Sequence, residues 1–131
     1  MIGIDTNVLL RLIVADNAAQ AKRVAGLIRA ETVRGNKLFI GHIALCETLW
    51  AMRSGYGHGR DQLATTVDEL LMMSEFVVEN SAQVKQALKL FRSTRADFSD
   101  CLMAIANREA GCTENVSFDK VAVKDHVFGE V

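Results

Sequence analysis

The sequence predicts an α/β fold in which helices cover both faces of a parallel sheet. Four segments repeat apolar residues with the period of a helix, and four shorter apolar segments have the length of buried strands. Strands that alternate with helices in this way form right-handed crossover units, which give a parallel sheet. The 131 residues also contain no proline, which favours helices over long loops.

Each predicted helix carries an apolar stripe that should face a core. The stripes are Ala21, Val24, Ala25 and Ile28; Leu63, Val67, Leu70 and Leu71; Val84, Ala87, Leu88 and Phe91; and Phe98, Cys101, Leu102 and Ile105. The predicted strands are residues 1–4, 38–40 and 76–78, with a weaker one that ends at 116–118. The glycine-rich segment 54–59 is predicted to break the helix and to join two helices.

The composition indicates one globular domain. Half of the residues are hydrophobic and 24% are charged, which argues against disorder and against a disulfide scaffold. The longest apolar runs stop far short of the roughly 20 residues that a membrane span needs, and we expect no membrane segment. The N-terminus lacks the pattern of a secretion signal, so we expect a cytoplasmic protein.

Two aspartates are predicted at the carboxyl ends of strands, where open α/β sheets bind ligands. Asp5 follows the first strand and Asp119 follows the last. Each could equally cap the helix that comes next, which is a common structural use of aspartate.

Glu47 interrupts an almost wholly apolar helix at residues 43–52, and such a helix is expected to be buried. By helical spacing one face comprises Ile43, Cys46, Glu47 and Trp50. We therefore expect the carboxylate to point inward, where it must be protonated, paired with a base or bound to a metal. A distant arginine is the structural alternative to a metal.

Asp97 and Asp100 lie on adjacent turns at the start of the helix that contains Phe98. Asp97 could serve only to favour the helix dipole, an explanation that is weaker for Asp100. With Asp5, Glu47 and Asp119 they are expected at one edge of one sheet. Clustered carboxylates repel one another unless a cation is bound, and all-oxygen ligands suit Mg²⁺ or Mn²⁺. Such ions support phosphodiester hydrolysis.

The basic residues concentrate in the first part of the chain. Residues 1–60 hold eight lysines and arginines against four acids, whereas residues 61–131 hold seven against twelve. This asymmetry indicates a basic face, with scattered solvated charge as the alternative. Arg11, Lys22 and Arg23 are candidates to contact a phosphate backbone rather than to read bases.

Four motifs resemble, in order and spacing, those of the PIN-domain ribonucleases, and more narrowly the VapC-type toxins of bacterial toxin-antitoxin pairs. They are Ile-Asp-Thr-Asn-Val-Leu at 4–9, Glu47, Ala-Asp-Phe-Ser-Asp-Cys-Leu-Met-Ala at 96–104, and Val-Ser-Phe-Asp-Lys at 116–120. The resemblance spans essentially the whole chain. It implies a single PIN-like domain, residues 1–131, with a three-layer α/β/α sandwich around a central parallel sheet of four to five strands.

The resemblance also implies an endoribonuclease that depends on Mg²⁺ or Mn²⁺. Carried over to this chain, the metal ligands are Asp5, Glu47, Asp100 and Asp119, with Asp97 as a supporting ligand or as the third ligand in place of Asp100. Thr6, Asn7 and Ser117 resemble the small polar residues that orient the acids or the attacking water. Ser117 stands where threonine is more usual and keeps the hydroxyl.

Further implied properties are a homodimer or larger assembly and a VapB-type antitoxin that blocks the site and carries the contact with operator DNA. Two alternatives remain. A degenerate PIN-like module would bind RNA or a partner without cutting. A phosphatase of the haloacid dehalogenase type also places an aspartate after its first strand, but it needs a second acid where this chain has Asn7.

Overall fold

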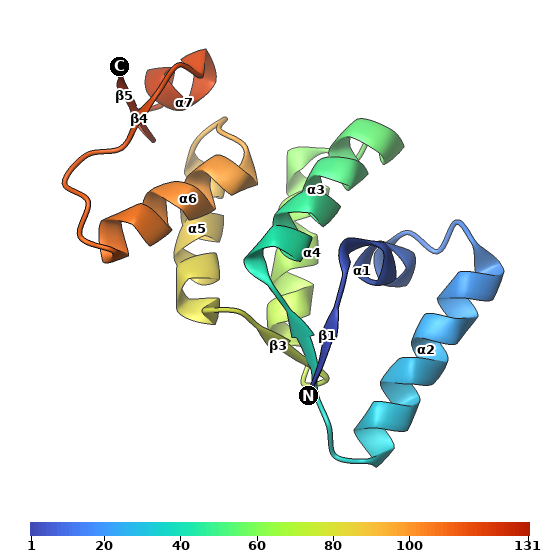
Figure 1. The fold of residues 1–131 in the computed structure, drawn as a ribbon. Helices are drawn as coiled ribbons and strands as arrows, with labels where there is room; N and C mark the ends of the chain where they lie inside the picture. Colours follow the sequence, from blue (N-terminus) through green and yellow to red (C-terminus); the bar gives the residue numbers. More distant parts are fainter. The chain divides into compact units, whose positions relative to one another are not determined.

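The computed structural model describes all 131 residues. The chain divides into two compact units, unit 1 from Met1 to Glu79 and unit 2 from Asn80 to Val131. The two units differ in architecture, as Figure 1 shows by their labelled elements. None of the helices combines the length and the apolar character needed to cross a membrane.

Unit 1 is built on a three-stranded parallel sheet. Its strands β1 (Ile2–Ile4), β2 (Leu38–Ile40) and β3 (Phe76–Val78) lie in the order β1-β2-β3. The register pairs Ile4 with Ile40 and Ile40 with Val78, so all three strands end at the same edge. The predicted strands at 38–40 and 76–78 are confirmed at their predicted limits, and the first strand is one residue shorter than predicted.

Four helices complete unit 1: α1 (Thr6–Ile13), α2 (Ala18–Val33), α3 (His42–Tyr56) and α4 (Arg60–Met72). Helix α1 packs on α2 and α3, while α4 packs on α3 and β3. Helix α3 ends at Tyr56 and is capped by Gly57, whose φ of +68° suits a residue without Cβ. The glycine-rich segment thus joins two helices as predicted, although α3 continues through Gly55, later than expected.

The apolar stripe predicted for α2 is only partly buried. Of its four residues Val24 alone is fully buried, and Ala25 is exposed. Near the end of α2 the buried side chain of Glu31 accepts hydrogen bonds from Arg34 at 2.9 Å and from the amide of Asn36 at 2.8 Å. These bonds hold the turn that leads from α2 into β2.

Unit 2 consists of a helix pair and a small sheet. Helices α5 (Ser81–Ser93) and α6 (Phe98–Glu109) pack together and bury the two predicted stripes completely. Within that contact the Phe91 and Phe98 rings meet edge to face with centroids 5.9 Å apart. Strand β4 (Val116–Ser117) is followed by α7 (Lys120–Lys124) and by strand β5 (Gly129–Glu130). The two strands pair in parallel.

The prediction of one parallel sheet with four to five strands is wrong in its count. The structure has one sheet of three strands and a separate sheet of two. The weak strand predicted near residue 117 pairs with β5 in unit 2 rather than with the sheet of unit 1. Strand β5 is only two residues long, which is too short for periodicity to reveal. The α/β class and the parallel pairing are confirmed.

Candidate metal-binding acids and the pocket beside Asp5

The first acid of unit 1 lies where β1 turns into α1. Asp5 is the N-cap of α1, and its Oδ1 accepts a hydrogen bond from the amide of Val8 at 3.0 Å. Asp5 therefore does cap the following helix, as the structural alternative predicted. Capping uses one carboxylate oxygen, and the exposed side chain leaves Oδ2 without a hydrogen bond. Asp5 can cap the helix and also act as a ligand.

The second acid of unit 1 is tied to this same junction. The hydroxyl of Thr6 donates a hydrogen bond of 2.7 Å to Glu47 Oε2 on α3. Since Thr6 directly follows Asp5, this bond brings the two carboxylates to one corner of unit 1. Asn7 is exposed in the first turn of α1, beside the same corner.

The expectation that Glu47 points inward is wrong, because its side chain is exposed. The predicted face does exist on α3, but it is the outer one: Ile43 is 77% exposed and Trp50 is 66% exposed. The buried face of α3 is formed by Leu45, Thr48, Leu49 and Met52. Both faces of this helix carry apolar residues, so hydropathy did not distinguish them.

Cys46, beside Glu47, is half-buried, and burial raises the pKa of its thiol to about 11. This thiol is therefore neutral near pH 7 and is a poor metal ligand in that state.

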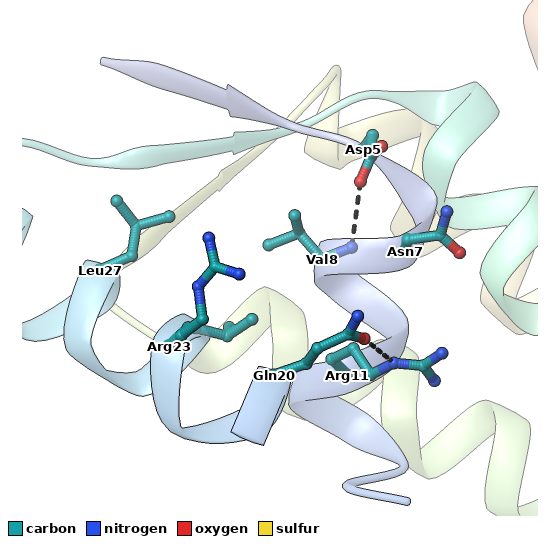
Figure 2. A pocket seen from close by; sticks show the side chains of 8 residues that line it. Asp5, Asn7, Val8, Arg11, Gln20, Arg23 and Leu27 are labelled. Carbon is teal, nitrogen blue, oxygen red and sulfur yellow. Dashed lines mark hydrogen bonds between the residues drawn. The ribbon is translucent and has the colours of Figure 1, made fainter. Parts of the chain in front are cut away.

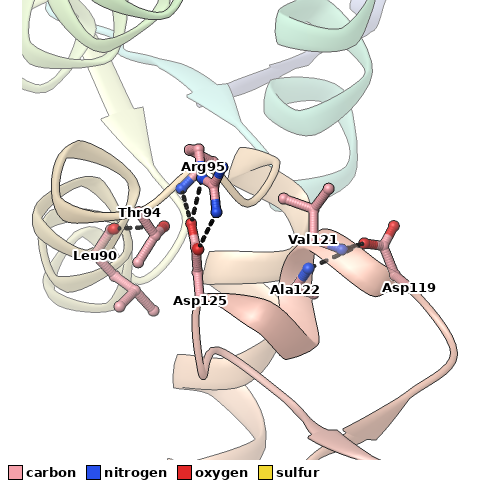
Figure 3. Close-up of polar contacts among 7 residues, drawn as sticks. All are labelled: Leu90, Thr94, Arg95, Asp119, Val121, Ala122 and Asp125. Carbon is pink, nitrogen blue, oxygen red and sulfur yellow. Dashed lines mark hydrogen bonds and ion pairs between the residues drawn. The ribbon is translucent and has the colours of Figure 1, made fainter.

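Unit 2 holds the other three predicted acids. Asp119 is the N-cap of α7, and its Oδ1 accepts hydrogen bonds from the amides of Val121 at 2.9 Å and Ala122 at 3.0 Å (Figure 3). The Ser117 hydroxyl accepts a 2.9 Å hydrogen bond from the Asp119 amide, which fixes the backbone ahead of the cap. Asp97 is the N-cap residue of α6 but makes no side-chain capping bond, and Asp100 lies in the first turn of that helix.

The three acids of unit 2 affect one another electrostatically. Burial raises the pKa of Asp100, and the negative charges of Asp119 and Asp97 raise that pKa further. A bound cation would remove this repulsion. In neither unit, however, do three or more histidine, cysteine, aspartate or glutamate side chains form a group that could hold a metal ion.

The chemistry of the donors fits a hard divalent cation. All five candidates are carboxylates, and Mg²⁺ and Mn²⁺ prefer oxygen ligands. In unit 1, Thr6 occupies one oxygen of Glu47 and leaves Oε1 without a hydrogen bond. In unit 2 both amides of α7 bond to Asp119 Oδ1 and leave its Oδ2 without a hydrogen bond.

A pocket of about 450 Å³ opens beside Asp5, between α1 and α2 (Figure 2). Its lining comprises Asp5, Asn7, Val8, Arg11, Gln20, Arg23, Val24 and Leu27. Two of the three predicted backbone-contacting residues, Arg11 and Arg23, therefore line the same pocket as the first acid. Lys22 is exposed on α2 and does not line this pocket.

The two arginines of the pocket have different surroundings. The guanidinium of Arg11 contacts Asp16 Oδ1 at 2.7 Å and Gln20 Oε1 at 2.6 Å. Tyr56 donates a 2.6 Å hydrogen bond to the other oxygen of Asp16, and this network raises the pKa of Arg11 and lowers that of Asp16. Arg23 makes no hydrogen bond or ion pair. Sequence reasoning missed Tyr56, which is 40 residues from its partner.

Sequence reasoning also missed a contact between His42 and Glu79 at the edge where the strands of unit 1 end. His42 follows β2 and Glu79 follows β3, and His42 Nδ1 lies 3.1 Å from Glu79 Oε2. His42 Nε2 also lies 2.7 Å from the carbonyl oxygen of Glu79. The available signal was the position of Glu79 directly after a predicted strand.

In unit 2 an ion pair links the segment before α6 to the end of α7. Asp125 accepts from the Arg95 side chain at 2.9 Å and 3.3 Å and from the Arg95 backbone amide at 2.5 Å (Figure 3). These bonds lower the pKa of Asp125 to about 2.

Comparison with known proteins gives two matches. The profile of the PIN domain family matches residues 2–125. A VapC ribonuclease of Aquifex aeolicus (strain VF5) is 26% identical over 117 residues, which cover 89% of this chain and 86% of that protein. Comparison with solved structures gives no match. The family resemblance predicted from the four motifs is confirmed.

Proposed function

Since the chain belongs to the PIN domain family, we propose that it is a metal-dependent endoribonuclease and the toxin of a toxin-antitoxin pair. The observation that carries the proposal is the junction at the end of β1, where the Thr6–Glu47 hydrogen bond gathers two exposed carboxylates. The relative described as a VapC ribonuclease supports cleavage of RNA as the activity.

The proposed metal ligands are Asp5, Glu47, Asp100 and Asp119, with Asp97 in support. They come from both units, and the family match across residues 2–125 supports treating the two units as one PIN domain. The mutual repulsion among the acids of unit 2 also supports a cation as their partner. The three-layer arrangement of the whole domain stays a prediction.

When bound, Mg²⁺ or Mn²⁺ would activate water and stabilise the leaving oxygen of the phosphodiester. The chain's own residues position the acids. Thr6 orients the Glu47 carboxylate, the helix cap orients Asp5, and the two amides of α7 orient Asp119. Fixed ligands of this kind keep the site organised before substrate arrives.

The partners proposed for this chain follow from the VapC resemblance. They are RNA as substrate, a VapB-type antitoxin that blocks the site, a second copy of the chain in a homodimer, and operator DNA through the antitoxin. Cytoplasmic location is part of the same proposal, because the RNA substrates of such a toxin are inside the cell.

The test is cleavage of total bacterial RNA by the purified protein, freed of antitoxin, with Mg²⁺ or Mn²⁺. We expect discrete new 5′ ends that disappear in EDTA and in the Asp5→Asn variant. Circular dichroism would show that both proteins are folded. Folded wild-type protein that cuts no RNA with either metal would contradict the proposal and favour a PIN-like module that only binds.

A further inference from the structure

We propose that the pocket between α1 and α2 binds the nucleotide next to the cleaved phosphodiester, with Arg23 contacting its phosphate. The apolar wall of Val8, Val24 and Leu27 would hold the ribose and base. This inference rests on the proposed ribonuclease function and adds a specific subsite to it.

The location and size of the pocket suit a nucleotide beside the cleaved bond. Asp5, a proposed metal ligand, forms part of its lining, so a ligand in the pocket would lie beside the reacting phosphodiester. Its volume of about 450 Å³ falls in the range of small-molecule sites, roughly 300–1,000 Å³. One nucleotide of an RNA strand is an occupant of suitable size.

The two arginines of the pocket differ in their availability to a phosphate. Figure 2 shows the Arg23 guanidinium reaching from α2 into the pocket toward Val8, whereas the Arg11 guanidinium points away. Asp16 already neutralises Arg11, so Arg11 acts as a positioning residue that holds Gln20. Arg23 has no partner in the protein, and its planar guanidinium matches the geometry of a phosphate.

The apolar wall of the pocket favours a nucleotide over a phosphate ion alone. Val24 is buried, while Val8 and Leu27 are half-buried at the pocket surface. A site for phosphate alone would not need this surface, but a ribose and a base have apolar faces to bury. Asn7 and Gln20 contribute side-chain amides to the lining, and such amides can bond to the edges of an unpaired base.

A purely electrostatic role is the main alternative for Arg23. In that case it would only offset the charge of Asp5, and any cation on the same helix surface would contribute equally to RNA binding. Lys22 is the natural control, because it is the neighbouring exposed cation on α2 and lies outside the pocket. Lys22→Gln and Arg23→Gln change the net charge of the protein by the same amount.

The experiment measures binding of a fluorescent single-stranded RNA of mixed sequence to the full chain in EDTA, so that no cutting occurs. We expect Arg23→Gln to raise Kd about tenfold, as loss of a charge-assisted contact to phosphate should. The dependence of log Kd on log salt should weaken by about 0.7 for one lost phosphate contact on a single strand. Lys22→Gln should change Kd by less than about threefold, because salt screens an exposed charge that makes no direct contact with the RNA.

A second variant tests the apolar wall without changing charge. Leu27→Trp should fill the pocket, raise Kd, leave the salt dependence unchanged, and alter the base preference next to the mapped cut sites. Arg23 is exposed, so Arg23→Gln should fold normally and keeps the proposal testable if Leu27→Trp does not fold.

Either of two other outcomes would contradict the proposed subsite. Equal effects of Lys22→Gln and Arg23→Gln would indicate diffuse attraction. Unchanged RNA binding in both Arg23→Gln and Leu27→Trp would assign the pocket to another ligand, such as a protein segment. In either case metal-dependent cutting by the wild type would leave the ribonuclease function intact. Folded wild-type protein that neither binds nor cuts RNA would overturn both proposals.

Discussion

The two units hold their acids in different ways. In unit 1 a threonine hydroxyl and a helix amide satisfy one oxygen of each carboxylate, and both acids are exposed to water. In unit 2 Asp100 is half-buried beside two other negative charges, and its pKa is raised by burial and by those charges. Unit 1 therefore positions both of its acids through hydrogen bonds, whereas unit 2 positions Asp119 in this way and leaves Asp100 with unfavourable repulsion that a cation would relieve.

The largest expected effect lies in unit 1. Glu47→Gln should lower RNA cleavage by more than about 100-fold, beyond the 10–100-fold typical of losing a residue that only orients a ligand. Glutamine can still accept the hydrogen bond from Thr6, and the side chain is exposed, so the melting temperature should stay the same or rise. Cleavage rates and thermal unfolding check this. A large fall in melting temperature would mean that Glu47 is a structural residue.

A smaller effect is expected when the orienting bond itself is removed. Thr6→Val keeps the shape of the side chain but cannot donate to Glu47, and cleavage should fall about tenfold as expected for a second-layer partner of a ligand. Thr6→Ser keeps the hydroxyl and is the matched control. Equal activities of the valine and serine variants would show that this bond does not position Glu47.

In unit 2 the corresponding change should stabilise the metal-free protein. Asp100→Asn removes the repulsion with Asp97 and Asp119, so we expect the melting temperature in EDTA to rise by a few degrees. Because the folded-state pKa is raised, the gain should be present at pH 7 and vanish below about pH 4, where the carboxyl is protonated in folded and unfolded chains alike. The stabilisation by added Mn²⁺ should shrink. A lower melting temperature at pH 7 would refute this account.

The smallest effect concerns the ion pair between Arg95 and Asp125. The pKa of Asp125 is about 2 in the folded protein, below its ordinary value, so the pair stabilises unit 2 above about pH 4. That contribution should be lost as the pH falls through about 2. Urea unfolding from pH 7 to pH 2 should therefore be less pH-dependent in Asp125→Asn than in the wild type. Identical pH profiles would argue against this ion pair.

The strand ends were predictable because periodicity and strand length are local properties of the sequence. Asp5 and Asp119 were correctly placed after strands. Both also cap the helix that follows, and in each the second carboxylate oxygen makes no hydrogen bond. The orientation of Glu47 was not predictable in this way. Helix α3 is apolar on two faces, and only the packing of α1 and α4 determines which face is covered.

Contacts between distant residues were also beyond the sequence. The basic stretch indicated Arg11, Lys22 and Arg23 as equivalent cations. In the structure Asp16 and Tyr56 hold Arg11, Lys22 lies outside the pocket, and only Arg23 is without a partner inside it. Charge counts describe attraction to phosphate, but selecting one cation requires knowing which others are already paired.

The pairing of Ile4 with Ile40 sets how accurately the acids of unit 1 are placed. Asp5 is the first residue after one of these partners, and α3, which carries Glu47, begins two residues after the other. A slip of one residue between β1 and β2 would move Asp5 by about 3.3 Å relative to α3, more than the length of a metal–oxygen bond. A single residue inserted in either strand should therefore inactivate the protein, because it moves Asp5 relative to α3 and turns buried strand side chains such as Ile40 away from the core.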